Sequence, residues 1–242
     1  MLELKQVNKK FKNFTLSDIS FQVPSGYITG LVGKNGAGKS SLIRIIMDVL
    51  RKDNGSISLD GLDSVKDGTR FRDQVGFVLE NADFFVQGKS AEENGNILGN
   101  LYSNWDQEKF LSYMEEFEIK KSEQKWSLIS QLSTGQFIRF QLAFALAHKP
   151  KLLLLDEPTG NLDPVFRMKF LEELQSAIET EELAVLFATH VTTDLDKIGD
   201  YITVMDQGRI LLSESKEELF DRYQTNRIAE VIKHISREKG GI

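Results

Sequence analysis

The chain has 242 residues, of which 40% are hydrophobic and 27% are charged, as in ordinary folded soluble domains. Its net charge is -6 at pH 7, and this acidic balance disfavours a general nucleic-acid binder, which usually carries a basic excess. The sequence contains no cysteine, which excludes disulfides and thiolate metal sites and fits a reducing cytoplasm.

No segment has the pattern of a secreted or membrane-spanning protein. Residues 1–5 lack the apolar core of a secretory signal. Purely apolar runs, such as residues 152–155, fall far short of the ~20 apolar residues that a spanning helix needs. We therefore expect a cytoplasmic protein that associates with a membrane only through a partner.

The first third of the chain contains a glycine-rich segment between a strand and a helix. Residues 27–32 end a stretch of strand patterns, and residues 41–50 have apolar side chains spaced for one helix face. Between them, residues 33–40 match G-x-x-x-x-G-K-[ST], the pattern of a phosphate-binding loop. The alternative is a glycine turn that happens to precede a helix, but the strand and helix on either side favour the loop.

The chemistry of this loop follows from its backbone. Glycines let successive N–H groups turn toward phosphate oxygens, and the helix N-terminus adds partial positive charge. Lys39 is expected to reach the β- and γ-phosphates of ATP, and Ser40 to bind Mg²⁺. The expected ATP-binding residues of this segment are Gly33, Lys34, Asn35, Gly36, Ala37, Gly38, Lys39, Ser40 and Ser41.

Helical patterns dominate from about residue 90 to residue 148, with loop signals at residues 94–96 and 130–134. At the second of these, a hydroxyl and a glycine directly precede a helix in Leu132-Ser133-Thr134-Gly135-Gln136. Ser133 and the backbone around Gly135 can offer hydrogen-bond donors to an anion. Taken alone, the segment is better explained as a plain helix cap.

Two acidic residues, Asp156 and Glu157, follow a predicted buried strand. Residues 152–155 are four leucines, as expected for a strand buried on both faces of a parallel sheet. A carboxylate at the end of such a strand is costly unless it meets a cation. We expect Asp156 to hold Mg²⁺ through water and Glu157 to polarise the attacking water. An acidic exit from strand to loop is the alternative, and the phosphate loop upstream favours the functional interpretation.

His190 lies at the end of a second apolar strand, just after its apolar residues 184–188. Its imidazole can contact a γ-phosphate or a catalytic carboxylate, although a lone histidine at a strand end is more often structural. A helix is predicted at residues 166–179, a hairpin around Asp206-Gln207-Gly208, and helices from residue 216 onward. Apolar strands that alternate with helices predict an α/β fold with a mostly parallel sheet.

In order and spacing, these motifs resemble the nucleotide-binding domain of ABC transporters over about residues 1–220. They are the phosphate loop, the signature segment 132–136, and then Leu152–Thr159, Asn161–Pro164 and His190. The resemblance implies a P-loop NTPase core with a mostly parallel sheet, an N-terminal antiparallel β lobe and an inserted helical signature lobe at about 88–148. It implies one ABC ATPase domain at 1–220, with a C-terminal helical tail at 221–242.

The resemblance also implies a mechanism. Two such domains, identical or different, pair head to tail, so that Ser133, Thr134, Gly135 and Gln136 act on the ATP bound by the other copy. It makes Glu157 the general base, His190 the switch residue beside the γ-phosphate, and Asp163 the residue that communicates across the dimer. The cofactors are ATP and Mg²⁺. The partner is an integral membrane permease that holds the protein at the inner face of the cell membrane, and no direct contact with nucleic acid is expected.

Several positions depart from the family pattern. Phe11 best matches the place of the base-stacking aromatic, usually tyrosine, with Phe14 second; a phenyl ring keeps the stacking face. Thr134 stands where glycine is commonest, and Asn161 where a small residue is common. Glu80 replaces the usual glutamine: it can bind Mg²⁺ but cannot donate an amide hydrogen bond.

Glu80, Thr134 and residues 101–106 resemble bacterial exporters of the bacitracin or multidrug efflux type, so export is expected. Residues 82–87, with Phe84 and Phe85, are expected to supply part of the groove that docks the permease. The alternative is a buried anchor for the loop. The sequence does not identify the cargo.

A non-transport ATPase clamp is the competing function. Relatives in DNA repair insert a long coiled coil between the phosphate loop and the signature, whereas the 91 residues 41–131 contain no sustained heptad run. Relatives in translation carry two cassettes in one chain, and this chain has one. A P-loop kinase or GTPase would leave residues 132–136 unexplained.

Overall fold

The computed structural model describes residues 1–79, 82–122 and 125–238. The strands are β1 (Leu2–Lys10), β2 (Thr15–Val23), β3 (Ile28–Val32), β4 (Asn54–Leu59), β5 (Leu62–Asp63), β6 (Val75–Leu79), β7 (Lys121–Ser122), β8 (Lys125–Trp126), β9 (Leu152–Asp156), β10 (Ala184–Thr189), β11 (Tyr201–Asp206) and β12 (Arg209–Ser215). The helices are α1 (Lys39–Ile46), α2 (Gly68–Arg72), α3 (Ala91–Leu98), α4 (Gln107–Glu116), α5 (Thr134–Leu146), α6 (Pro164–Glu181), α7 (Thr192–Ile198), α8 (Lys216–Tyr223) and α9 (Ile228–Glu238), with the short 3₁₀ helices η1 (Gly99–Leu101) and η2 (Ile129–Gln131).

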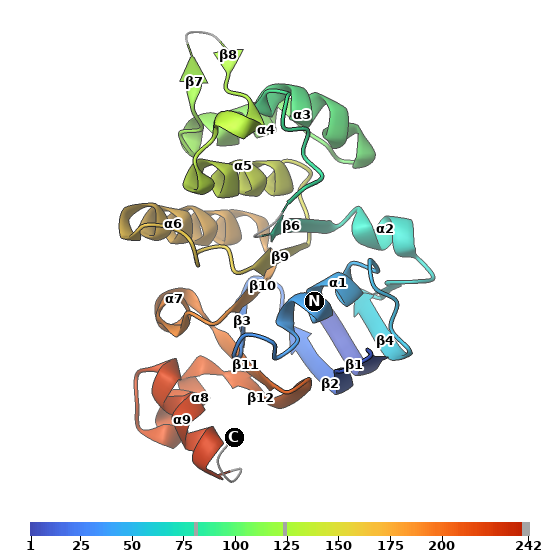
Figure 1. The fold of residues 1–242 in the computed structure, drawn as a ribbon, viewed down its shortest axis with the longest axis vertical. Helices are drawn as coiled ribbons and strands as arrows, with labels where there is room; N and C mark the ends of the chain where they lie inside the picture. The colour runs from blue at the N-terminus through green and yellow to red at the C-terminus, as the bar shows by residue number, and fades with distance from the viewer. Residues whose placement is uncertain (80–81, 123–124, 239–242) are drawn as a thin grey trace.

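Two sheets form the body of the molecule (Figure 1). The larger has six strands in the order β12-β11-β3-β10-β9-β6, and every pair is parallel except the hairpin β11–β12. The smaller has the order β2-β1-β4-β5 and is antiparallel throughout. The predicted α/β fold, with a mostly parallel sheet and an N-terminal antiparallel β lobe, is confirmed.

The apolar runs of β9 and β10 divide the interior into two cores. Side chains alternate across a strand, so Leu153 and Leu155 enter a core shared with α5, α6 and α7, while Leu152 and Leu154 enter one shared with α1 and the β lobe. All four leucines are fully buried, and such burial contributes about 1.5–3 kcal/mol each. This two-sided burial fixes the register of the central strands.

Because the central strands are parallel and in register, their carboxyl ends meet at one edge. Val32 of β3 pairs with Thr189 of β10, and Ala188 pairs with Asp156 of β9. The phosphate loop, the acidic pair and His190 therefore leave the sheet side by side. In open α/β sheets this edge is where ligands bind.

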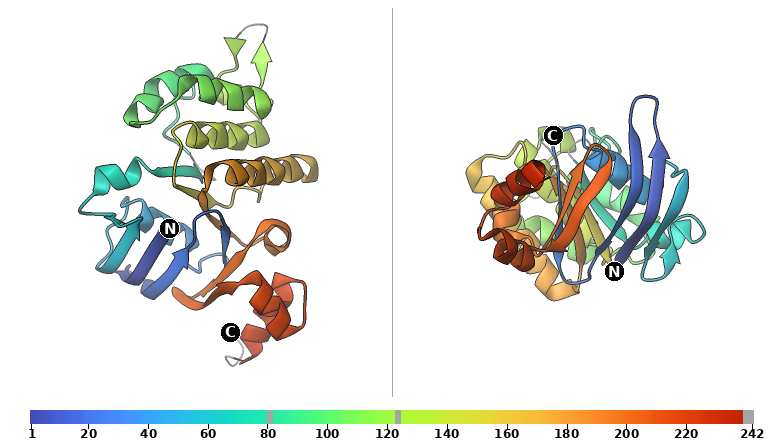
Figure 2. Two further views of the ribbon diagram at one scale, coloured as in Figure 1. Left: turned by 180° about the vertical axis from the view of Figure 1, so that it is seen from behind. Right: turned by 90° about the horizontal axis from the view of Figure 1, so that it is seen from below.

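The helical lobe, which contains α3, α4 and α5, lies at one end of the molecule, and α8 and α9 lie at the other (Figure 2). Aromatic side chains hold the lobe together: the ring of Phe85 lies 4.8 Å from Phe140 and 5.3 Å from Phe144, and Trp105 lies 5.1 Å from Phe110.

The loop expected at residues 94–96 is wrong, because α3 runs through it. Asn94 is buried, and its side chain accepts a hydrogen bond from the backbone of Val86 at 2.8 Å instead of closing a turn. Gly95 is there because of packing: a Cβ would lie 2.4 Å from the ring of Phe110. The second loop signal is confirmed, since a short 3₁₀ helix ends at Gln131 and α5 begins after Ser133.

The predicted hairpin and the C-terminal helices are present. Gln207 and Gly208 both have positive φ, 43° and 76°, as a tight turn between β11 and β12 requires. Ile228, Val231 and Ile235 are the buried face of α9. Among residues 1–79, 82–122 and 125–238, no helix is both long and apolar enough to cross a membrane.

Candidate functional site

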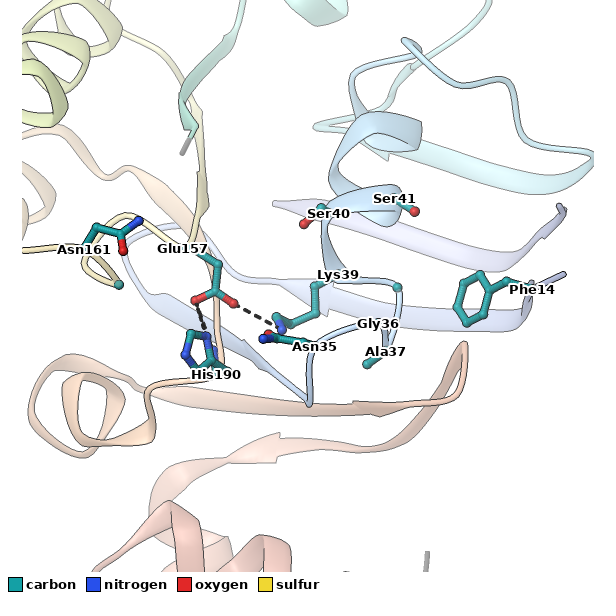
Figure 3. A pocket seen from close by; sticks show the side chains of 12 residues that line it. Phe14, Asn35, Gly36, Ala37, Lys39, Ser40, Ser41, Glu157, Asn161 and His190 are labelled. Carbon is teal, nitrogen blue, oxygen red and sulfur yellow. Dashed lines mark hydrogen bonds and ion pairs between the residues drawn. The ribbon is translucent and has the colours of Figure 1, made fainter. Parts of the chain in front are cut away.

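A cavity of about 470 Å³ opens at the carboxyl edge of the six-stranded sheet (Figure 3). Its lining residues come from the phosphate loop, from the segment after β9 and from the end of β10. They are Phe14, Asn35, Gly36, Ala37, Gly38, Lys39, Ser40, Ser41, Glu157, Gly160, Asn161 and His190. Most of the expected ATP-binding residues, both expected catalytic residues and Ser40 are thus brought together.

The backbone of the phosphate loop requires glycine at its end. Gly38 has φ 111°, and a Cβ there would lie 2.7 Å from Leu16 and 2.9 Å from the ring of Phe14. This conformation ends the loop at Lys39, where α1 begins. Free N–H groups at a helix N-terminus favour phosphate.

Lys39 crosses the cavity and joins the loop to the acidic segment. Its ammonium donates to the carbonyl oxygen of Gly33 at 2.8 Å and lies 3.2 Å from a carboxylate oxygen of Glu157. The side chain is only 6% exposed, so its charge acts in a region of low dielectric. Phosphate oxygens that enter the cavity would meet this charge.

Ser40 and Asp156 place a hydroxyl and a carboxylate, oxygen groups of the kind that Mg²⁺ prefers, beside each other. The Ser40 hydroxyl donates to Oδ1 of Asp156 at 3.0 Å. Within the described residues, no group of three or more acidic or histidine side chains is placed to hold a metal ion by itself. Glu80, the third expected ligand, lies outside the described residues.

Glu157 is held by four groups. Its backbone has φ 50°, an uncommon conformation that costs about 1–3 kcal/mol, and its N–H donates to the carbonyl of Ala188 at 2.9 Å. One carboxylate oxygen accepts from the Thr189 hydroxyl at 3.1 Å and from the His190 N–H at 3.2 Å, and it lies 2.9 Å from Nδ1 of His190. The other oxygen faces Lys39.

These neighbours decide the protonation of Glu157. Burial opposes ionisation, but the hydrogen bond from His190 and the charge of Lys39 outweigh it, so the pKa of this carboxyl lies below its usual value. Glu157 is therefore a carboxylate at neutral pH. It can accept a hydrogen bond from a water molecule and orient it.

Thr189 is a site residue that was not predicted from the sequence. Its hydroxyl donates a hydrogen bond to Glu157 and accepts one from the backbone N–H of Val191. The available signal was a hydroxyl residue at the last position of an otherwise apolar strand.

Asp163 caps α6, since its Oδ1 accepts hydrogen bonds from the N–H groups of Val165 and Phe166. This contact explains the residue locally, and its role between subunits stays a prediction.

The signature segment begins α5 at a distance from the cavity. Ser133 and Gln136 exchange hydrogen bonds between side chain and backbone, both at 3.3 Å, which forms a capping box. Ser133 and Thr134 are exposed, whereas Gly135 is buried against the ring of Phe166. Among the described residues that line the cavity, none belongs to this segment.

The two candidate aromatics differ in position. Phe11 and Phe14 both line a neighbouring cavity of about 1000 Å³, together with Lys34, and their ring centroids are 6.1 Å apart. Phe14 also lines the cavity at the phosphate loop, and Phe11 does not. The structure therefore places Phe14 closer to the loop than the favoured Phe11.

Known proteins share this fold and these motifs. The family described as ABC transporter matches residues 16–160. The chain is 31% identical to the uncharacterized ABC transporter ATP-binding protein YdbJ of Bacillus subtilis (strain 168), over 87% of this chain and 68% of YdbJ. It is 32% identical to the methionine import ATP-binding protein MetN of Pasteurella multocida (strain Pm70), over 98% and 72%. The structure of cbiO1 from Clostridium perfringens, part of the ABC transporter complex cbiONQ, is 25% identical with a TM-score of 0.78, over 97% of this chain and 94% of cbiO1.

Proposed function

Because this chain belongs to the ABC transporter family as an ATP-binding and ATP-hydrolysing subunit, we propose that it pairs head to tail and drives an integral membrane permease. The pair consists of two copies, or of one copy and a related cassette. The signature of each subunit completes the ATP site of the other. The protein works at the inner face of the cell membrane, where the permease holds it.

The observation that carries this proposal is the separation of the two halves of the site within one chain. The phosphate loop, Glu157 and His190 surround one side of the cavity, while the exposed hydroxyls of Ser133 and Thr134 lie in the helical lobe. A second copy in a two-fold arrangement brings the missing half to each cavity.

The residues of the cavity fit hydrolysis of the γ-phosphate. Lys39 and the loop amides bind the β- and γ-phosphates, and Ser40 and Asp156 hold Mg²⁺, which when bound neutralises charge on those phosphates. Glu157 orients the attacking water and accepts its proton. His190 lines the cavity with its ring 2.9 Å from Glu157, so it would fix that carboxylate and lie beside the γ-phosphate of bound ATP.

The two phenylalanines expected at the permease contact have different roles. Phe85 is 3% exposed and belongs to the aromatic cluster of the helical lobe, so it anchors the loop. Phe84 is 41% exposed and lies 5.2 Å from Phe77. Phe77 lines a cavity of about 300 Å³ together with Asp73 and Tyr102.

This surface is the proposed permease contact. Its rim includes Leu101, whose 77% exposure leaves an apolar side chain uncovered beside the charged Arg72. An apolar segment with a charged end would suit it. The relative cbiO1, described as part of a transporter complex, supports a partner of this kind.

Export is the proposed direction, and it rests on the resemblance of Thr134 and residues 101–106 to drug exporters. MetN, an import protein by name, is 32% identical over 98% of this chain, so the overall similarity of the ATP-binding subunit does not by itself distinguish export from import. Transport of a labelled cargo in vesicles that contain both subunits would measure it.

Substitution of Phe84 tests the permease contact. Phe84→Ala is expected to keep ATP hydrolysis and lose capture of the co-expressed permease, since the side chain is exposed and lies outside the ATP cavity. Tyr27→Ala is the matched control, because Tyr27 is an aromatic residue 47% exposed directly before β3, and two strands separate β3 from β6 in the six-stranded sheet. Capture that is the same for both variants would refute the contact.

A further inference from the structure

Three segments that carry site residues meet at one buried carboxylate, Asp194 in the first turn of α7. Its Oδ2 accepts a hydrogen bond from the hydroxyl of Thr159 at 2.6 Å, and its Oδ1 accepts from Nε of Arg167 at 2.5 Å. Asp194 is 2% exposed and Thr159 is 1% exposed. Arg167 also donates to the hydroxyl of Thr193 at 2.8 Å, so the guanidinium is held at two points.

The first segment is the turn that contains Glu157. Glu157 has φ 50°, a conformation that persists in a non-glycine residue only when its surroundings fix it. Its own N–H is tied to Ala188, and the turn continues with the bonds from Gly160 N–H to Glu157 O and from Leu162 N–H to Thr159 O. The bond from Thr159 to Asp194 is a second anchor for this turn.

The other two segments are the starts of α6 and α7. Arg167 lies one turn into α6, and its backbone N–H donates to the carbonyl of Asp163 at 2.9 Å. The position of its guanidinium is therefore tied to that of Asp163, the residue that caps this helix. Asp194 lies four residues after His190, at the start of α7. The ion pair therefore fixes the distance between the Asp163 turn and the His190 segment.

We propose that Asp194 is a positioning residue for ATP hydrolysis, which holds the Glu157 turn, the His190 segment and the start of α6 in one arrangement. The proposal rests on the function proposed above for Glu157, His190 and Asp163. A buried ion pair is weak evidence for stability, since apolar side chains of similar shape often stabilise a fold equally well. Directional hydrogen bonds from two segments to one carboxylate instead specify geometry, which hydrolysis requires and folding does not.

The test is steady-state ATP hydrolysis by folded variants, measured together with ATP affinity. Thr159→Val keeps the shape of the side chain and removes the donor to Asp194; Asp194→Asn keeps the shape and removes the charge. Both are expected to lower kcat by about 10- to 100-fold, because a displacement of about 1 Å from a distant change can cost about 100-fold. The KM for ATP and the Kd for ATP should change less than about threefold, since neither residue lines the ATP cavity.

Two further comparisons separate positioning from general stability. The double variant Thr159→Val with Asp194→Asn should lose little more than the worse single variant, because both remove the same link. Arg167→Lys should retain more activity than Arg167→Gln. The control is the ion pair between Glu214 of β12 and Arg222 of α8, neither of which lines the ATP cavity. Glu214→Gln and Arg222→Lys should leave kcat unchanged.

Folded Thr159→Val and Asp194→Asn proteins with the parent kcat would overturn the inference, and so would equal losses of kcat and ATP affinity. If Asp194→Asn does not fold, Thr159→Val decides the question alone. Failure of the proposed function looks different: the parent protein would not hydrolyse ATP, or Glu157→Gln would remain fully active.

Discussion

At the scale of single residues, Lys39 and Glu157 lie 3.2 Å apart, and each changes the environment of the other. The ammonium helps to keep the carboxyl ionised, and the carboxylate holds the ammonium in the cavity. Phosphate oxygens compete for the same cation. Lys39 is therefore the residue whose loss should weaken nucleotide binding most directly.

Lys39→Ala is expected to raise the Kd for ATP by about 10- to 150-fold, because a hydrogen bond to a charged group contributes about 1.5–3 kcal/mol. Equilibrium binding of a fluorescent ATP analogue measures this. Lys233→Ala, which removes an exposed lysine paired with Glu230 on α9, is the control and should leave the Kd unchanged. Equal affinities for all three proteins would contradict the role assigned to Lys39.

His148 gives the chain a specific sensitivity to acid. Burial lowers its pKa to about 4, and its ring is 1% exposed and stacks on Tyr102 at 3.9 Å. The unfolded chain has the ordinary pKa of about 6.5. Because the pKa is lower in the folded state, protonation favours the unfolded chain. The free energy of unfolding therefore has its full value above pH 6.5 and falls by about 3 kcal/mol as the pH is lowered toward 4.

Urea unfolding at pH 6.5, 5.5 and 4.5 tests this linkage. Acid should reduce the free energy of unfolding of the parent protein more steeply than that of His148→Leu, which has no proton to gain at this position. Carboxylates contribute equally to both proteins, so the difference between the two slopes belongs to His148. Parallel slopes would show that the imidazole takes up its proton as readily in the folded protein as in the unfolded chain, which contradicts the lowered pKa.

At the scale of elements, helices and strands that depend on a local sequence pattern were predicted, whereas those that depend on contacts with residues distant in sequence were missed. The strand at residues 184–188 was predicted to within one residue of its observed bounds, Ala184–Thr189, because a short, fully apolar run favours a buried strand. The helix through Asn94 and Gly95 was missed, because the side chains that make it favourable, Phe110 among them, are distant in sequence.

The same distinction holds for the site. The phosphate loop, Asp156, Glu157 and His190 could be predicted, because each follows a strand in a recognisable motif. Phe14 lies nearer the loop than Phe11, and this depends on how the β1–β2 turn folds over Gly38, which no local pattern encodes. Asp194 was missed for a related reason: a single acid in a polar helix has no signal until its partners Thr159 and Arg167 are seen beside it.

Gly95→Ala measures how tightly the helical lobe is packed. A Cβ would lie 2.4 Å from the buried ring of Phe110, and the strain of such overpacking, about 1–3 kcal/mol, exceeds the helix propensity gained, about 1 kcal/mol. The free energy of unfolding should fall. Gly88→Ala is the control, since a Cβ there meets nothing within 4 Å and should change stability by less than about 0.5 kcal/mol. A stable Gly95→Ala protein would mean that α3 moves freely against α4.

At the scale of the whole molecule, the proposed function assigns complementary halves of one ATP site to the body and to the helical lobe. The phosphate loop belongs to the six-stranded sheet, and the signature belongs to α5 (Figure 1). α6 packs beneath the signature through Phe166 and Gly135, and the same helix is capped by Asp163. In the proposed dimer, movement of the partner against the signature would therefore be transmitted to the turn that contains Glu157.

The state of association of Glu157→Gln with ATP and Mg²⁺ tests this account most directly. The variant should bind ATP but not hydrolyse it, since the amide cannot accept the proton of water, and ATP should hold two subunits together. Size-exclusion chromatography with light scattering should give twice the monomer mass for Glu157→Gln with ATP, and the monomer mass for the same protein with ADP. The double variant Glu157→Gln with Lys39→Ala should remain a monomer with ATP. A Glu157→Gln protein that binds ATP and remains a monomer would contradict the shared site.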